Sequence, residues 1–172
     1  MPDESSPARL LYSRARMPDP RPLLLEPLPR LEPAEAFTQF MRQFEGDTAV
    51  AHMGLPSGDR VTISDNLFKS RQGEWKLAKR GRDVWLLYLA ELAQRPQEIW
   101  LLSDTMVSEL HVLGRFQRGT QRIDALLVFE RNDHGQPWMG KTAFVSDRKR
   151  YLGDIRRGFV RDARAKLVWQ EM

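Results

Sequence analysis

Four segments after Pro96 alternate apolar and polar side chains with a period of two. They are EIWLL, ELHVLGRFQ, RIDALLVFER and WMGKTAFVS, which begin at Glu98, Glu109, Arg122 and Trp138. This alternation is typical of β-strands that bury one face. The turn signals GT and NDHGQP separate the last three segments. The pattern therefore predicts four strands, of which the last three follow one another as an antiparallel meander.

Helical patterns precede these strands. The run EPAEAFTQFMRQFEG has Pro33 at a helix start and phenylalanines on one stripe. Residues 79–95 form the strongest helical pattern, and Tyr88 on its buried face needs a hydrogen-bond partner. Helices followed by an antiparallel meander belong to the α+β class. We therefore expect N-terminal helices packed on a four-stranded antiparallel β-sheet.

Proline dominates the beginning of the chain. Eight of the eleven prolines fall within the first 33 residues, and this spacing excludes helix interiors and central strands. We expect residues 1–32 to be an extended linker, with Leu23 to Leu25 able to dock, and residues 33–172 to form the domain. Deleting residues 1–30 should then leave the fold intact. Such a linker also suggests a tether to a larger polypeptide.

Composition excludes several classes of protein. Cysteine is absent, so disulfides, thiolate metal sites and a cysteine nucleophile are ruled out. The three histidines are too widely spaced for a zinc motif, and we expect neither a metal nor a cofactor. No segment has the ~18 consecutive apolar residues of a membrane span, and no secretory signal is recognisable. We therefore expect action in the cytoplasm of a target or host cell.

The charge of the chain suits a polyanionic ligand. The formal net charge is +4, and residues 141–166 carry nine Lys or Arg against three Asp. A basic half of this kind is typical of proteins that bind nucleic acid. A solvated arginine-rich surface explains the charge equally well.

One predicted strand carries groups suited to RNA cleavage. In ELHVLGRFQ, the side chains of Glu109, His111 and Arg115 share the face opposite the apolar one. Two proton-transfer groups and a cation are what metal-free attack by a ribose 2′-hydroxyl needs. Charged residues are also common on a half-exposed strand.

Basic side chains gather at two further places. Four cations lie between residues 76 and 82, where they oppose the dipole of the following helix unless they bind phosphate. In GKTAF, a threonine hydroxyl lies beside a lysine and could orient a phosphate oxygen, although threonine also favours strands in general.

Several of these segments together resemble a known family. The blocks VTISDNLF, EWKLAKRGRDVWLLYLAELAQRPQEIWL, LHVLGRF, LLVFE, GKTAF and YLGDIRRGF are similar to the second phage subfamily of the barnase–EndoU–colicin–RelE-like nucleases. The resemblance covers roughly residues 35–160. Domains of this kind occur at the C-termini of phage Mu F-like head morphogenesis proteins and of polyvalent toxins. The resemblance implies a barnase/RelE-like fold and metal-independent RNA cleavage. It also supports Lys76, Lys79, Arg82, Glu98, Arg115 and Thr142 as site residues.

The leading hypothesis is an RNA-cleaving toxin domain that works by 2′-hydroxyl attack on the adjacent phosphate. Its expected partners are RNA, with tRNA as one candidate, and a cognate immunity protein, and its parent could be a phage head protein. Two alternatives stay open: a non-enzymatic nucleic-acid or capsid-interaction module, and an ADP-ribosyltransferase toxin. The predicted catalytic residues are His111, Arg115, Glu109, Lys79 and Thr142, and the predicted RNA-binding residues are Lys76, Arg80, Arg82, Glu98, Lys141, Arg148 and Arg157.

Overall fold

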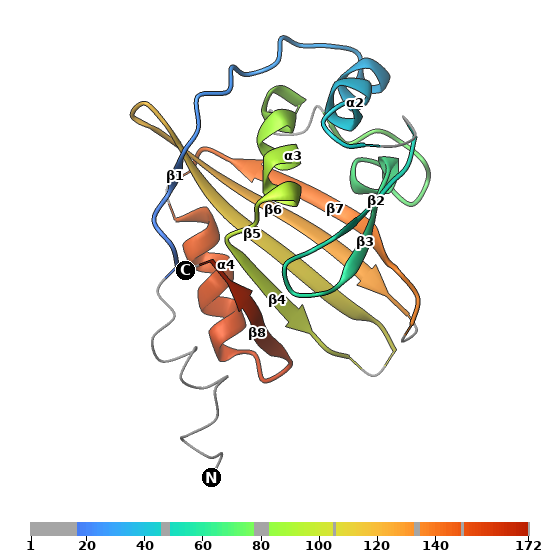
Figure 1. Cartoon of the computed structure of the whole chain (residues 1–172), viewed down its shortest axis with the longest axis vertical. Coiled ribbons are helices and arrows are strands. Elements are labelled where there is room, and N and C mark those ends of the chain that lie inside the picture. The colour runs from blue at the N-terminus through green and yellow to red at the C-terminus, as the bar shows by residue number, and fades with distance from the viewer. Residues whose placement is uncertain are drawn as a thin grey trace.

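A curled mixed β-sheet forms the centre of the molecule (Figure 1). The computed structural model describes residues 17–45, 49–77, 83–104, 106–132, 135–148 and 150–171. The strand order is β2-β3-β7-β6-β5-β4-β8, and the short β1 pairs with one end of β5. The strands are β1 (Arg21–Pro22), β2 (Ala51–Gly54), β3 (Arg60–Ile63), β4 (Glu98–Leu102), β5 (Ser108–Arg118), β6 (Gln121–Arg131), β7 (Trp138–Ser146) and β8 (Ala165–Gln170).

Helices accompany the sheet in the described part of the chain. They are α2 (Pro33–Met41), η1 (Asp65–Leu67), α3 (Leu86–Gln94) and α4 (Tyr151–Arg161). The mixed content confirms the α+β class. No helix among the described residues is long and apolar enough to cross a membrane.

The predicted meander is present, but the sheet is larger than expected. Strands β4, β5, β6 and β7 pair antiparallel in chain order, and β5 and β6 stay in register from Ser108 opposite Arg131 to Arg118 opposite Gln121. The expectation of a four-stranded, all-antiparallel sheet is wrong. The β2–β3 hairpin joins β7 through a parallel pairing, β1 runs parallel to β5, and β8 adds an edge beside β4. The six-residue β8 was not predicted from the sequence, because its apolar and polar alternation lies within a basic tail.

Helices cover both faces of the sheet. On one face, α2, α3 and η1 pack over the apolar sides of β5, β6 and β7 and form the larger core. Gly114 permits the close approach of α3, because a Cβ there would lie 2.6 Å from a methyl carbon of Leu92. On the other face, α4 buries Leu152 and Phe159 against a second apolar cluster that contains Trp100 and Leu113. This second layer lies on the side of β5 that carries the predicted site.

Residues 17–32, which we call the arm, contain no helix, as their prolines predict, and they pack against the rest of the domain. Met17 is buried, and Arg21 lies opposite Phe116 in the β1–β5 pairing. The backbone N–H of Leu23 donates to Gln117 at 3.0 Å, and the Tyr88 hydroxyl donates to the carbonyl of Leu25 at 2.7 Å.

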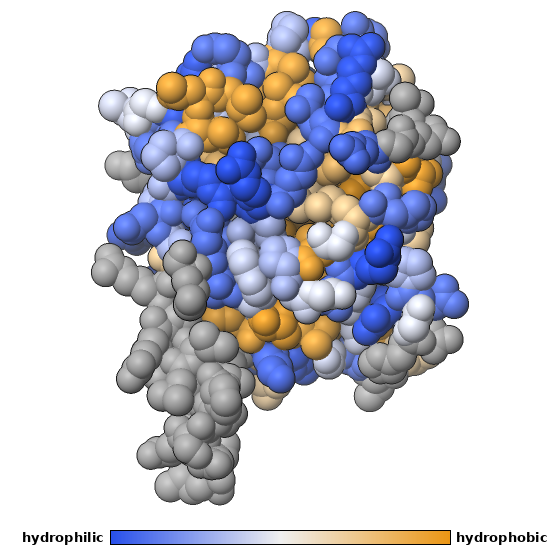
Figure 2. All heavy atoms as spheres, viewed as in Figure 1, coloured by the Kyte–Doolittle hydropathy of each residue, from blue (hydrophilic) through white to orange (hydrophobic). Residues whose placement is uncertain are grey.

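The arm runs from β1 over the molecule to α2 (Figure 1), and Figure 2 shows hydrophobic side chains along its path. Its leucines at 23, 25, 28 and 31 are partly buried against the larger core. Residues 1–16 lie outside the described part of the chain.

Removing the arm should therefore destabilise the domain. A chain that starts at residue 33 loses the partner of Tyr88 and the partial burial of four leucines, each worth about 1.5–3 kcal/mol when complete. We expect a loss on the order of 3–5 kcal/mol in unfolding free energy, or roughly 10 °C in Tm, measured by thermal and urea unfolding. A chain that starts at residue 17 is the matched control. Equal stability of the two truncated chains would contradict the docked arm.

Candidate functional site

The alternation of β5 places the predicted residues on one face of the sheet. Leu110, Val112 and Phe116 enter the larger core, whereas Glu109, His111 and Arg115 point to the opposite face. Helix α4 crosses this face. The rings of Phe159 and His111 meet edge to face, with centroids 5.0 Å apart.

The predicted trio divides into two clusters. Four residues of extended strand separate His111 from Arg115, a distance of about 13 Å. Leu113 lies between them and is buried in the cluster under α4. The structure thus places His111 beside Glu109, and Arg115 beside Asp124 and Gly153, so the members of the predicted trio have separate sets of neighbours.

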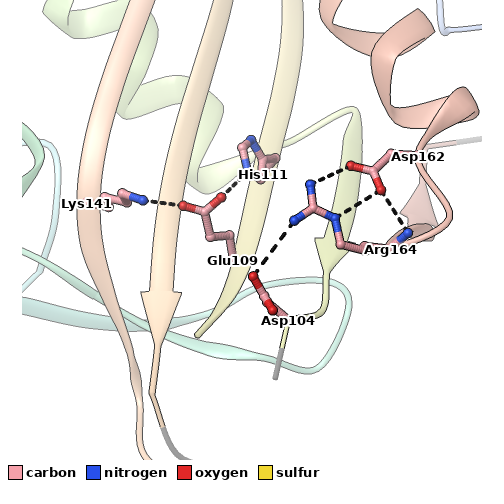
Figure 3. A network of polar contacts seen from close by, with 6 residues as sticks. All are labelled: Asp104, Glu109, His111, Lys141, Asp162 and Arg164. Carbon is pink, nitrogen blue, oxygen red and sulfur yellow. Dashed lines mark hydrogen bonds and ion pairs between the residues drawn. The ribbon is translucent and has the colours of Figure 1, made fainter. Parts of the chain in front are cut away.

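Glu109 is the centre of the first cluster (Figure 3). One carboxylate oxygen lies 3.2 Å from Nε2 of His111, and the other accepts a hydrogen bond from Nζ of Lys141 at 2.5 Å. Glu130 lies directly opposite Glu109 on β6, and its carboxylate is 3.9 Å from the same ammonium group. Two like charges opposite one another destabilise a sheet. Lys141 offsets that repulsion.

A β-bulge brings Lys141 to this position. In the pairing of β6 with β7, Val128 lies opposite Thr142 and Phe129 lies opposite Gly140. Lys141 is therefore the extra residue of the bulge, a feature that redirects a side chain. Gly140 permits the packing there, because a Cβ would lie 2.8 Å from Leu67.

The electrostatics of the pair Glu109 and His111 favour a carboxylate beside a neutral imidazole. Burial alone would raise the pKa of Glu109, but hydrogen bonds from Lys141 and His111 outweigh it and lower that pKa. Burial lowers the pKa of His111 below its ordinary value, against the opposing effect of Glu109. Nδ1 of His111 is buried and has no hydrogen-bond partner among the described residues. Of the two ring nitrogens of His111, Nε2 is thus the one that contacts a partner, the carboxylate of Glu109.

Glu109 and Lys141 line a pocket of about 280 Å³ together with Arg164. Arg164 follows α4 and is held by Asp162 at 2.9 Å, and it lies 3.8 Å from Asp104 (Figure 3). The pocket thus offers a carboxylate that can accept a proton, an ammonium group and a guanidinium. These groups suit chemistry on a phosphodiester. Sequence reasoning missed Arg164 and Asp104, because no local pattern joins them to β5.

Arg115 belongs to the second cluster, which lies along α4. Its neighbour across the sheet is Asp124, which is fully buried. Asp124 accepts hydrogen bonds from Nε of Arg122 and from the backbone N–H of Leu152, both at 3.1 Å, and so caps α4. Burial, followed by the charge of Arg122, lowers the pKa of Arg115. The guanidinium remains charged at neutral pH.

Glu98 is not an RNA contact, which corrects the prediction. The residue is fully buried, and Nε and Nη2 of Arg156 donate to its two oxygens at 2.7 and 2.9 Å. Gln170 and Trp100 donate further hydrogen bonds to the same carboxylate. Glu98 therefore joins β4 to α4 and β8, and no face of it reaches a ligand.

The structure places the remaining predicted residues as follows. Thr142 is half-buried and shares a cross-strand row with Val128 and His111. Lys76 is half-buried, and its neighbours Trp75 and Leu77 pack in the larger core. Arg148 is exposed, and Arg157 pairs with Asp154 beside the second cluster. Lys79, Arg80 and Arg82 lie outside the described residues.

A family comparison identifies the class of this domain. A model of the family described as phage-Barnase-EndoU-ColicinE5/D-RelE like nuclease 2 matches residues 38–161, more than two thirds of the chain. The chain belongs to this family. The expected resemblance is thereby confirmed, and the site described above is that of a nuclease-family domain. No curated protein and no solved structure shows significant similarity to the chain.

The stretch matched by the nuclease family contains most of both clusters. Among the residues that line the pocket and the groove along α4, all except Met17, Asp19 and Arg164 lie within the stretch that the nuclease family matches. Among the described residues, no three carboxylate or imidazole side chains gather closely enough to hold a metal ion.

The burial of His111 predicts a pH-dependent stability. Because its pKa is lower in the folded state than the ordinary value of 6.5, the unfolded chain binds more protons as the pH falls below that value. His111 thus contributes stability that is present above pH 6.5 and is lost as the pH falls through the folded-state pKa. We expect Tm to fall between pH 7.5 and 5.5, and the fall to be shallower in His111→Gln.

His52→Gln is the matched control for this measurement, since it removes a histidine from β2 on the other side of the molecule. Differential scanning calorimetry at several pH values provides the comparison. A His111→Gln protein whose Tm falls as steeply as that of the wild type would contradict the assignment.

Proposed function

We propose that this domain is a metal-independent endoribonuclease of the toxin type, and that the Glu109 pocket is where RNA is cut. Family membership supports nuclease activity. The observation that carries the finer proposal is the carboxylate of Glu109, held between His111 and Lys141 on the wall of a pocket that also contains Arg164.

The proposed reaction is a transesterification within the RNA chain. Glu109 takes the proton of a ribose 2′-hydroxyl, and the 2′-oxygen forms a bond to the adjacent phosphorus. The bond from phosphorus to the 5′-oxygen breaks, and Lys141 gives its proton to that leaving oxygen. Arg164 stabilises the extra negative charge of the phosphorane. The products are a 2′,3′-cyclic phosphate and a 5′-hydroxyl, and proton exchange with water restores both side chains.

His111 acts in this proposal as a positioning residue. Its Nε2 holds Glu109, while Nδ1 is buried beside α4, so the ring has no open nitrogen for the substrate. This differs from the general acid or base role that the sequence predicts. Thr142, one cross-strand row from His111, is a candidate to orient a phosphate oxygen.

The wider biological roles stay proposals of the same kind. The proposed substrate is cellular RNA, with tRNA as one candidate, and the proposed place of action is the cytoplasm of a target or host cell. An immunity protein would neutralise the activity most directly by covering the pocket at Glu109 and Lys141. Arg148 is exposed near the start of α4 and is a candidate backbone contact.

Incubation of the purified chain with total RNA in excess EDTA tests the function. We expect discrete cleavage by the wild type, and a rate about 10²–10⁴ lower for Glu109→Gln, the usual contribution of one proton-transfer group. Lys141→Met should be impaired similarly. Glu26→Gln is the matched control, because the Glu26 side chain on the arm is exposed and pairs with Arg118, far from the pocket along the chain.

Two results would overturn the proposal. One is cleavage by Glu109→Gln at the rate of Glu26→Gln. The other is intact RNA in EDTA with cleavage after a divalent metal ion is added.

A further inference from the structure

We propose that a groove alongside α4 binds the phosphates of the RNA strand at a distance from the bond that is cut. In naming RNA as the ligand, this inference rests on the proposed function. The groove has a volume of about 500 Å³, and its walls carry the side chains of Arg115, Arg156, Arg157 and Arg161. Met17 and Asp19 of the arm form the opposite wall.

The acidic side chains near the groove do not neutralise all of its arginines. Arg156 is paired with Glu98, and Arg157 is paired with Asp154. Arg115 and Arg161 have no carboxylate within ion-pair distance among the described residues. Among the described residues that line the groove, Asp19 is the acidic one. The groove therefore has a surplus of positive charge, which suits a polyanion.

One N–H group of Arg115 lacks a hydrogen-bond acceptor among the described residues. Its Nε is buried and has no hydrogen-bond partner in the described part of the chain. A buried donor without a partner carries a desolvation cost, and the guanidinium as a whole keeps its charge. Those atoms of the Arg115 guanidinium that line the groove can donate the strong, charge-assisted bonds that phosphate oxygens accept. Nη2 of Arg115 lies beside Gly153, where a Cβ would be 3.9 Å away, so the first turn of α4 leaves it room.

The walls of the groove are held by buried polar contacts. Gln97 is 2 % exposed, and its side chain joins the two walls: its Nε2 donates to the carbonyl of Asp19 at 2.9 Å, and its Oε1 accepts from the backbone N–H of Arg115 at 2.7 Å. Asp124 caps the adjacent end of α4. The arginines therefore project from fixed backbone, and little ordering is needed on binding.

The position of the groove relates it to the Glu109 pocket. Six residues of extended strand separate Arg115 from Glu109, a distance of about 20 Å along β5. Helix α4 follows the same course, with Gly153 near Arg115 and Phe159 against His111. A single RNA strand along α4 can thus occupy both places. The groove would increase affinity for longer strands and would not contact the reacting phosphate.

Binding of a 2′-O-methyl RNA tests this inference without any cleavage. A fluorescent strand of about 12 nucleotides has no 2′-hydroxyl to attack and is long enough for such a site. We expect Arg157→Gln/Arg161→Gln to bind it about tenfold more weakly at low salt by fluorescence anisotropy. The slope of log K against log salt should fall in magnitude by roughly 1.4, since each single-strand phosphate contact contributes about 0.7.

Two further variants sharpen the measurement. Arg30→Gln/Arg42→Gln removes the same charge from exposed positions on the arm and α2, away from the groove, and should keep nearly the wild-type slope. Asp19→Asn removes the one carboxylate of the groove and should tighten binding a few-fold at low salt, because repulsion of phosphate is lost. Thermal melting of each variant verifies that the fold is intact.

The results separate this inference from the proposed function. If Arg157→Gln/Arg161→Gln binds with the same Kd and slope as the control variant, the groove proposal is overturned, even if Glu109 is shown to be needed for cleavage. If the wild-type chain binds the strand through the groove but cuts no RNA, the groove stands and the proposed function fails.

Discussion

The buried ion pair between Glu98 and Arg156 is the interaction on which both clusters depend. Glu98 of β4 is fully buried, and the guanidinium of Arg156 on α4 contacts both of its oxygens. Removal of one partner from such a pair typically costs 3–5 kcal/mol. The pair fixes α4 to the sheet, and α4 in turn packs Phe159 against His111, forms one wall of the arginine groove and leads to Arg164. Together with the packing of Leu152 and Phe159, the pair holds the helix that borders both the pocket and the groove.

Strand alternation predicted the part of the site that local sequence determines. A period of two assigns each side chain to a face, so Glu109, His111 and Arg115 were expected on one face of β5, as observed. The alternation pattern does not reveal which helix or strand covers that face. The crossing of α4 and the burial of Leu113 divide the trio, and both depend on a helix some 40 residues further along the chain. The bulge that brings Lys141 to Glu109 is likewise invisible to a periodic pattern.

Two features of the structure depend on distant partners that no local pattern shows. Glu98 was expected in the site because of the family resemblance, yet its partner Arg156, which lies 58 residues away, holds it in the interior. The prolines of the arm correctly exclude helices, but they do not prevent docking: backbone groups of Leu23 and Leu25 still pair with β5 and with the hydroxyl of Tyr88. The sequence indicated that Tyr88 needed a partner, and could not indicate which one.

The central claim is that the Glu109 pocket uses the 2′-hydroxyl of its own substrate as the nucleophile. The most direct test is a DNA strand that contains one ribonucleotide, with the product ends identified by mass spectrometry. Our account predicts a single cut on the 3′ side of the ribonucleotide, which leaves a 2′,3′-cyclic phosphate and a 5′-hydroxyl. Cleavage at deoxynucleotides, or products that end in a 5′-phosphate, would contradict it.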